Sequence, residues 1–167
     1  MTQRRDVLAL GILSGAALLA WPPASAAAAD CPPTAQAAVM AALADKYAAA
    51  VNAHDTSSFP DIHTESYIQH SGRSPSGLAA QIELFKRIFA AMPDLRMVVE
   101  DRIIAGDKIV SRNAWSATHT NTIRGIPPTG KPFTFHTIDI WRVENGKLAE
   151  HWDVTDTIEV LRKLRGE

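Results

Sequence analysis

Acidic and tryptophan side chains alternate in the C-terminal third of the chain, around the dipeptide Asn145-Gly146. An Asn-Gly pair between two alternating runs is the strongest short signal of a β-hairpin with a two-residue turn. Regular pairing across this turn sets Trp141 opposite Glu150. It sets Asp139 opposite Trp152 on the same face. A solvated strand face rarely needs tryptophan and a packed core rarely tolerates carboxylates, whereas a half-apolar ligand pocket uses both.

The alternation leaves the identity of the pocket acid open. In a regular hairpin Asp139 and Glu150 share one face, whereas His151 and Asp153 share the other. Either Asp153 reaches the pocket through a β-bulge, or the pocket acid is Asp139 or Glu150. A carboxylate walled by tryptophan and isoleucine is poorly solvated, which suits a general acid/base. The three carboxylates are therefore the candidate catalytic residues.

Other side chains of the strands and their flanks are candidates for the pocket lining. They are His70, His119, His136, Trp141, Trp152 and Arg112. We expect Arg112 to neutralise Asp101 across a second hairpin, and the alternative role is to hold an anionic ligand group. The remaining histidines, His151 among them, are interpreted as surface or helix-end residues. No His-x-His or His-Glu-x-x-His spacing occurs, so we expect no metal site.

Composition narrows the class of protein. The 167 residues suit one domain, and 46% of them are hydrophobic, which is enough for a core. The formal net charge of −1 offers no basic patch, so a nucleic-acid partner is not expected. A single cysteine excludes an intrachain disulfide.

The N-terminus has the pattern of an export signal. Arg4-Arg5 precede a weakly apolar stretch that ends near Trp21, and a run of small residues follows from Ala24 to Ala29. This order is typical of a signal peptide, and the twin arginine resembles a Tat signal. The apolar stretch is too short for a membrane span. We expect residues 1–29 to be removed, which leaves residues 30–167 periplasmic or secreted and without a membrane association.

The rest of the chain reads as helices followed by strands, an α+β pattern. The expected helices run from a Thr34 cap to about Asn52, briefly after His54–Ser58, from Leu78 to Met92, and from Asp156 to Leu164. The expected strands run over Leu95–Ala105, Lys108–Thr120 and the two arms of the Asn-Gly hairpin, as a four-stranded antiparallel meander. The apolar stripe of the first helix is Val39, Leu43, Tyr47 and Val51, with Met40 and Ala50 beside them. Pairing about Gly106-Asp107 sets Asp101 opposite Arg112 and Val99 opposite Ala114.

Several short motifs in this order are recognisable together. They are Tyr67-Ile68-Gln69-His70, Met92-Pro93-Asp94-Leu95, Ala105 to Arg112, Thr118-His119-Thr120, Gly125 to Lys131, and Asp139 to Asp153. Between about Tyr47 and Leu164 the chain resembles the SnoaL-like polyketide cyclases, often labelled ester cyclases, of the nuclear-transport-factor-2-like superfamily. The resemblance implies a cone-shaped barrel in which N-terminal helices pack on a curved antiparallel sheet.

The resemblance also implies a chemistry. Relatives close a ring by an intramolecular aldol condensation without a cofactor, with an aspartate as general acid/base. The matching residue is Asp153, so the order of candidates becomes Asp153, Asp139, Glu150. The implied partner is a small hydrophobic molecule. The superfamily also pairs through the outer sheet face, so we expect a homodimer, with Arg96, Val98, Trp115 and His119 as its candidate surface.

Two functions remain open at this point. The first is an exported acid/base enzyme, acting as a cyclase, isomerase, dehydratase or hydrolase on a small hydrophobic carbonyl compound. The second is a periplasmic small-molecule-binding protein that kept the pocket without catalysis. Polyketide biosynthesis is cytoplasmic, so export would separate this chain from the family's usual substrates. A carboxylate with a raised pKa deep in the cavity would favour the enzyme, and a cavity filled by tryptophan and phenylalanine with all acids outside it would favour the binding protein.

Overall fold

The elements of the chain follow the order expected from its periodicity. The computed structural model describes residues 34–72 and 74–166, which lie within one compact unit. Its helices and strands are α1 (Ala35–Asn52), α2 (Phe59–Ile62), β1 (His63–Gln69), α3 (Leu78–Ala91), β2 (Arg96–Ala105), β3 (Lys108–Thr118), β4 (Pro132–Glu144), β5 (Lys147–Thr155) and α4 (Thr157–Arg165). The predicted export signal lies outside the described residues. Within them, no helix combines the length and apolar character needed to cross a membrane.

Helix α1 begins at the predicted cap. The Thr34 hydroxyl accepts a hydrogen bond from the backbone N–H of Ala37 at 3.1 Å, which satisfies one of the free donors of the first turn. The buried stripe differs from the predicted one at a single position. Val39 is 61% exposed, whereas the rest of the predicted stripe, including Met40 and Ala50, is buried in the core. The helix is therefore rotated slightly from the orientation that the alanine-rich pattern indicated.

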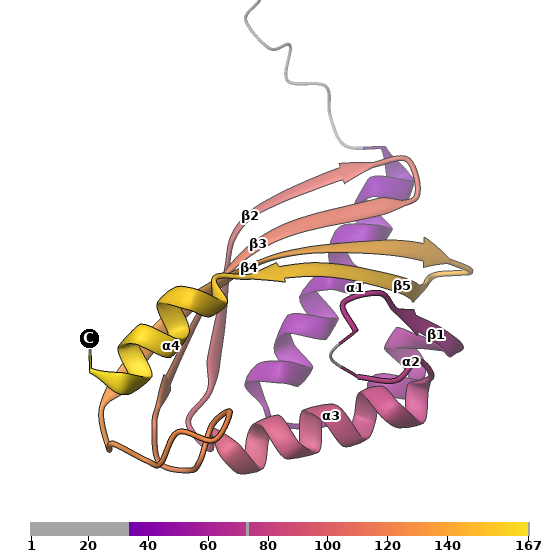
Figure 1. Ribbon diagram of the computed structural model, residues 1–167. Coiled ribbons are helices and arrows are strands. Elements are labelled where there is room, and N and C mark those ends of the chain that lie inside the picture. Colours follow the sequence, from indigo (N-terminus) through magenta and orange to yellow (C-terminus); the bar gives the residue numbers. More distant parts are fainter. Residues whose placement is uncertain (1–33, 73, 167) are drawn as a thin grey trace, which may run out of the picture. The chain divides into compact units, whose positions relative to one another are not determined.

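The strands form one five-stranded sheet in the order β1-β5-β4-β3-β2 (Figure 1). The four strands β2 to β5 pair antiparallel, as the meander predicted. The fifth strand, β1, pairs parallel with the free edge of β5, so the prediction of a wholly antiparallel sheet was wrong. Residues His63–Gln69 form this strand because the free edge of β5 offers them backbone partners. The α+β class and the curved sheet are as predicted.

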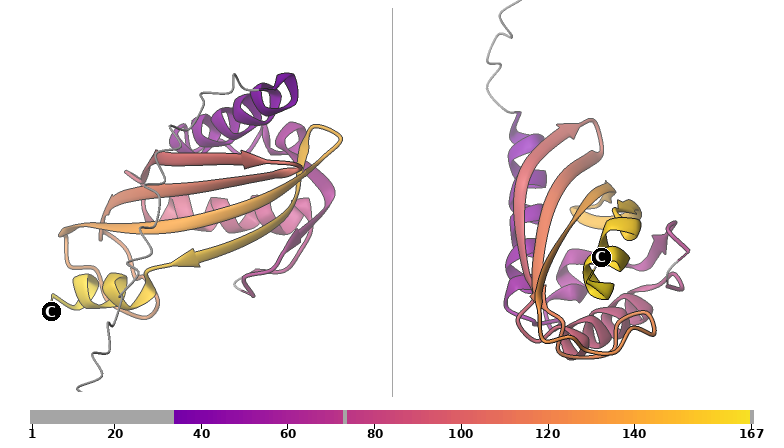
Figure 2. Two further views of the ribbon diagram at one scale, coloured as in Figure 1. Left: turned by 90° about the horizontal axis from the view of Figure 1, so that it is seen from above. Right: turned by 60° about the vertical axis from the view of Figure 1, so that its left-hand side comes forward.

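The helices cover one face of the curved sheet. Figure 2 shows α1 and α3 on the same side of it, while the outer face is left without a helix over most of its length. Helix α1 packs on β2 and β3, α3 on β1, and α4 on β4. The curvature of the sheet away from α3 leaves space between the two layers, and this space holds the site described below.

A β-bulge at Ala149 sets which side chains of β5 face inward. Glu144 pairs with Lys147 and Val143 with Leu148, as the Asn-Gly turn requires. The register then shifts by one residue, so that Arg142 pairs with Glu150 and Trp141 with His151. The predicted pairing of Trp141 with Glu150 was therefore wrong. Beyond the bulge the faces of β5 are exchanged relative to β4.

A second bulge at Glu100 has the same effect on β2. Asp101 pairs with Arg112 as predicted, but Val99 pairs with Asn113 and not with Ala114. Strand β3 consequently turns its odd-numbered residues inward, and Trp115 is 7% exposed. The prediction that Trp115 faces the outer surface was wrong.

An aromatic cluster around Tyr47 forms the deep end of the core. The Tyr47 ring lies 5.3 Å from Trp141, 6.1 Å from Phe85 and 6.3 Å from Phe59, measured between ring centroids. The imidazole of His63 is fully buried among these rings. Burial disfavours its charged form and lowers the pKa of His63 to about 4, although a hydrogen bond to the Phe59 carbonyl opposes the shift.

This buried histidine predicts a loss of stability in mild acid. Between the unfolded pKa of about 6.5 and the folded value near 4, the unfolded chain binds one more proton, so stability rises with pH across that window. Between pH 7 and pH 4.5 we expect the wild type to lose roughly 2 kcal/mol more than His63→Phe. Urea denaturation at both pH values measures the difference. Equal losses in the two proteins would contradict it.

Candidate active site

A cavity of about 680 Å³ is lined by residues of the inward face of the sheet and of helices α1 and α3. Its volume is typical of a site for a small organic ligand. Aromatic and aliphatic side chains from the two layers form most of its wall; they include Tyr47, Phe85, Ile88, Leu95, Trp115, Phe133 and Phe135. The polar groups on the sheet side of the wall are Thr137, Asp139, His151, Asp153 and Thr155.

Asp139 is the centre of a buried hydrogen-bond network. The carboxylate is 6% exposed. Its Oδ1 lies 2.9 Å from Nε2 of His151, and its Oδ2 accepts a hydrogen bond from Asn113 Nδ2 at 2.7 Å. The Thr137 hydroxyl donates to the same Oδ2, and its oxygen accepts a hydrogen bond from the Trp115 indole N–H at 2.9 Å. Both carboxylate oxygens are thus occupied by neighbouring groups.

The hydrogen bonds of Gln69 determine how the ring of His151 is oriented. The backbone N–H of Ser71 can only donate, and it lies 3.2 Å from Gln69 Oε1. The amide nitrogen of Gln69 therefore faces Nδ1 of His151 at 3.0 Å, which makes Nδ1 an acceptor. In its neutral form His151 then carries its proton on Nε2 and donates it to Asp139. Gln69 thereby fixes the tautomer of the histidine.

Asp153 stands directly opposite Asp139 across the β4–β5 pair. Both line the cavity, and Asp153 is half-buried while Asp139 is buried. The bulge at Ala149 places the two carboxylates on one face, which is the first of the two arrangements that the sequence left open. Two acids side by side in an apolar wall resemble the pairs that enzymes use for proton transfer.

The third candidate acid, Glu150, points to the outer face of the sheet. It accepts hydrogen bonds from Arg142 Nε at 2.6 Å and pairs with His70 Nε2 at 2.8 Å. The contacts with His70 and Arg142, in that order, lower the pKa of Glu150. His70 also stacks on Trp152, with the two ring centroids 4.3 Å apart. Glu150, His70 and Trp152 therefore lie away from the cavity that holds Asp139 and Asp153.

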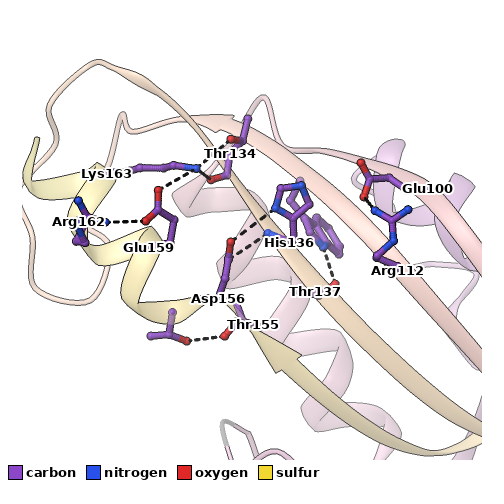
Figure 3. A network of polar contacts seen from close by, with 12 residues as sticks. Glu100, Arg112, Thr134, His136, Thr137, Thr155, Asp156, Glu159, Arg162 and Lys163 are labelled. Carbon is purple, nitrogen blue, oxygen red and sulfur yellow. Dashed lines mark hydrogen bonds and ion pairs between the residues drawn. The ribbon is translucent and has the colours of Figure 1, made fainter. Parts of the chain in front are cut away.

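Four other predicted lining residues also lie elsewhere. Trp141 is buried behind the site and stacks on His151 at 5.1 Å. His119 is fully buried beside Thr129, where it holds the loop between β3 and β4. His136 is exposed and meets Asp156 at the start of α4, and Arg112 is exposed on the outer face, where it pairs with Glu100 and not with Asp101 (Figure 3).

Sequence reasoning missed four residues of the site: His151, Gln69, Asn113 and Thr137. Each was assigned no role, because regular alternation turned His151 to the outer face. The signal was present in two forms. Leu148 and Ala149 are consecutive apolar residues, a pattern that a bulge buries on one side, and Gln69 belongs to a motif of the family resemblance. Within the described residues, no group of three or more His, Cys, Asp or Glu side chains is arranged to hold a metal ion.

The fold is a curved β-sheet with helices on one face, and an apolar cavity that contains acids lies between the helices and the sheet. Proteins of the cone-shaped α+β class share this arrangement. A family model of the SnoaL-like polyketide cyclases matches residues 41–164, so the chain belongs to that family. No functionally curated protein matches it.

The chain also shares its fold with solved structures. It is similar to TsrD from Streptomyces laurentii, at 28% identity over 76% of this chain and 95% of that one, with a TM-score of 0.72. It is also similar to AclR from Streptomyces galilaeus, at 28% identity over 78% and 98% of the two chains, with a TM-score of 0.70. A SnoaL-like polyketide cyclase from Agrobacterium tumefaciens shares the fold, at 21% identity over 73% and 94% and a TM-score of 0.66.

The role of Gln69 predicts a defined protonation pattern at His151. Nitrogen-15 NMR of labelled histidine in the wild type is expected to show the neutral ring with its proton on Nε2. In Gln69→Glu a carboxylate would replace the amide donor, so Nδ1 should gain a proton. Gln69→Leu should remove the tautomer preference without adding a proton. A wild-type ring protonated at Nδ1 alone would contradict the network.

Proposed function

We propose that the protein is a cofactor-independent acid/base enzyme that acts on a small hydrophobic carbonyl compound. The observation that carries this proposal is the pair of facing carboxylates, Asp139 and Asp153, in the wall of an apolar cavity. A binding protein for a hydrophobic ligand would gain nothing from two acids in that wall, since their desolvation costs free energy. Their position inside the cavity favours the enzyme over the binding protein.

The network assigns different tasks to the two acids. Both oxygens of Asp139 are held by His151, Asn113 and Thr137, so Asp139 is a fixed acceptor that orients the site. Proton transfer then falls to Asp153, which takes a proton from the carbon beside a carbonyl and later returns one. A single positioned carboxyl can do both steps.

Tyr47 supplies a hydrogen-bond donor for the oxygen of the substrate. It lines the cavity, and burial, followed by the nearby charge of Asp139, raises the pKa of Tyr47 well above its usual value. The phenol therefore keeps its proton at any working pH. A neutral O–H in an apolar wall can donate to a carbonyl oxygen and stabilise the enolate that forms when the proton leaves.

The test needs a reaction that does not depend on the natural substrate. Exchange of the protons beside the carbonyl of 1-indanone in D₂O, followed by proton NMR, reports the first step of the proposed chemistry. We expect Asp153→Asn to lower the enzyme-dependent rate about 10²- to 10⁴-fold, the usual contribution of a general acid/base. Asp139→Asn should cost less.

Glu150→Gln is the matched control, because it neutralises a carboxylate of the same strand on the outer face. Its exchange rate should equal that of the wild type. If Asp153→Asn retains the full rate while the wild type is active, the assignment of Asp153 is wrong. If the wild type gives no exchange above background with several aryl ketones, the binding-protein hypothesis takes precedence.

Assembly and location are part of the proposal. The outer sheet face exposes Val98, Ile138 and Val154, and the last two are cross-strand partners. Adjacent exposed apolar side chains on a bare sheet face are typical of an interface, so we propose a homodimer through this face. The candidate surface no longer includes Trp115 or His119, which are buried. The export pattern of residues 1–29 supports a location in the periplasm or outside the cell, which N-terminal sequencing of the mature protein checks.

The dimer is tested by a matched pair of substitutions. Val154 is 72% exposed on the outer face and Val39 is 61% exposed on α1. A lysine at position 154 would place a charge in the interface, so Val154→Lys should sediment as a monomer at micromolar concentration, where the wild type is a dimer. Val39→Lys should remain dimeric. A monomeric wild type would contradict the proposal.

A further inference from the structure

Two arginines on the cavity wall form no direct salt bridge with any carboxylate of the described residues. Arg87 and Arg124 line the cavity, and both are exposed, so they lie on its open side. In the part of the chain that the structure describes, neither forms a salt bridge or a hydrogen bond; the charge of Arg87 helps to lower the pKa of Glu83, one turn earlier on α3, but the direct partner of that carboxyl is Lys86. By contrast, Arg102, Arg112 and Arg142 each meet a carboxylate. The charge at the cavity opening is therefore available to a ligand.

Both arginines reach the opening because the β3–β4 loop is fastened to α3. The side-chain amide of Asn121 in this loop donates to the backbone carbonyl of Ala90 at 3.1 Å, near the end of the helix. Figure 1 shows the loop beside the C-terminal end of α3. Arg124 at the tip of the loop and Arg87 one turn before that end thus belong to adjoining walls.

The backbone at Arg124 adopts a conformation that arginine does not favour. Its φ is 50° and that of Gly125 is 78°, and reciprocal hydrogen bonds between Ile123 and Ile126 of 3.1 and 2.9 Å close the turn. The Asn145-Gly146 turn has almost the same values, 50° and 75°. Asparagine is the usual residue at the first position of such a turn. An arginine in this backbone conformation costs conformational free energy, which points to a function for its side chain.

The cavity is consequently polarised along its length. Asp139 and Asp153 lie on the sheet side and are buried or half-buried, the two arginines lie at the opening, and aromatic rings separate them. Phe135 stacks on Trp115 with ring centroids 5.8 Å apart, which gives this middle section a flat aromatic surface. A ligand that entered with an anionic end inward would be repelled by the carboxylates of Asp139 and Asp153. In the reverse orientation its anionic end meets the two arginines and its uncharged end meets the acids.

We propose that the substrate is an aromatic or polyunsaturated compound with an anionic group, a carboxylate or a phosphate, which Arg87 and Arg124 bind at the cavity opening. This inference rests on the proposed function and adds the substrate class to it. Arginine binds planar anions through paired N–H donors, and the anchored end fixes which part of the substrate reaches the acids. Arg87 and Arg124 act on orientation and specificity and do not contact the reacting carbon.

Binding of naphthalene probes to the purified protein tests the proposal without turnover. Dissociation constants are measured by calorimetry for 2-naphthoate, 2-naphthyl phosphate and the neutral 2-naphthamide. The wild type should bind at least one anion more tightly than the amide. Arg124→Asn keeps the turn and removes the charge, and it should weaken that anion roughly three- to tenfold while leaving the amide unchanged. Arg87→Gln should have a similar effect.

Lys86→Gln is the matched control, because it removes the same charge from the same helix at a residue outside the cavity lining. It should keep the preference for the anion. Equal affinity of the wild type for anions and amide, or an anion preference that survives both arginine substitutions, would overturn the inference and leave the proposed function standing. If no probe binds at millimolar concentration, the apolar ligand site itself is refuted, together with both proposals. The relative affinity of naphthoate and naphthyl phosphate identifies which anion the opening prefers.

Discussion

The register of the β4–β5 pair decides what this protein can do, and one extra residue sets that register. Without the bulge at Ala149, strict alternation would turn Asp153 outward and bring Glu150 into the cavity. With it, Asp153 faces Asp139, and Glu150 meets Arg142 on the outer face. The bulge therefore lets Glu150 meet Arg142 and His70 on the outer face and, at the same time, brings a second carboxylate into the cavity. The site is a consequence of strand pairing more than of any single side chain.

The elements were predictable because their signals are local. The Thr34 cap, the Asn145-Gly146 turn and the period of the apolar residues each act over a few positions, and the structure has helices and strands where they indicate. The registers were not predictable from alternation alone, since a bulge shifts the pairing without interrupting the strand. Charge complementarity would have corrected the predicted register of the hairpin. The observed register pairs Arg142 with Glu150, whereas the regular register pairs Trp141 with that acid.

The candidate site was predictable in part for the same reason. Two of the three proposed acids line the cavity, because both lie on strands whose existence was clear. The histidines were harder to place, since a buried imidazole needs partners that only the fold brings near. His151 depends on Gln69, which is 82 residues away in the sequence, whereas His70 finds Trp152 and Glu150 outside the cavity. Residue type alone could not distinguish these environments.

The cost of burying Asp139 explains why the two acids cannot have the same task. An isolated carboxylate in an apolar wall is strongly disfavoured, and hydrogen bonds to a charged group each return about 1.5–3 kcal/mol. Three such donors converge on Asp139, one from its own strand β4 and one from each of the neighbouring strands β3 and β5. If Asp139 accepted a proton from the substrate, it would have to release one of these hydrogen bonds. That would break the network that holds His151 and Thr137 in place. A residue stabilised in this way is suited to orient the site, and the more exposed Asp153 is suited to exchange protons.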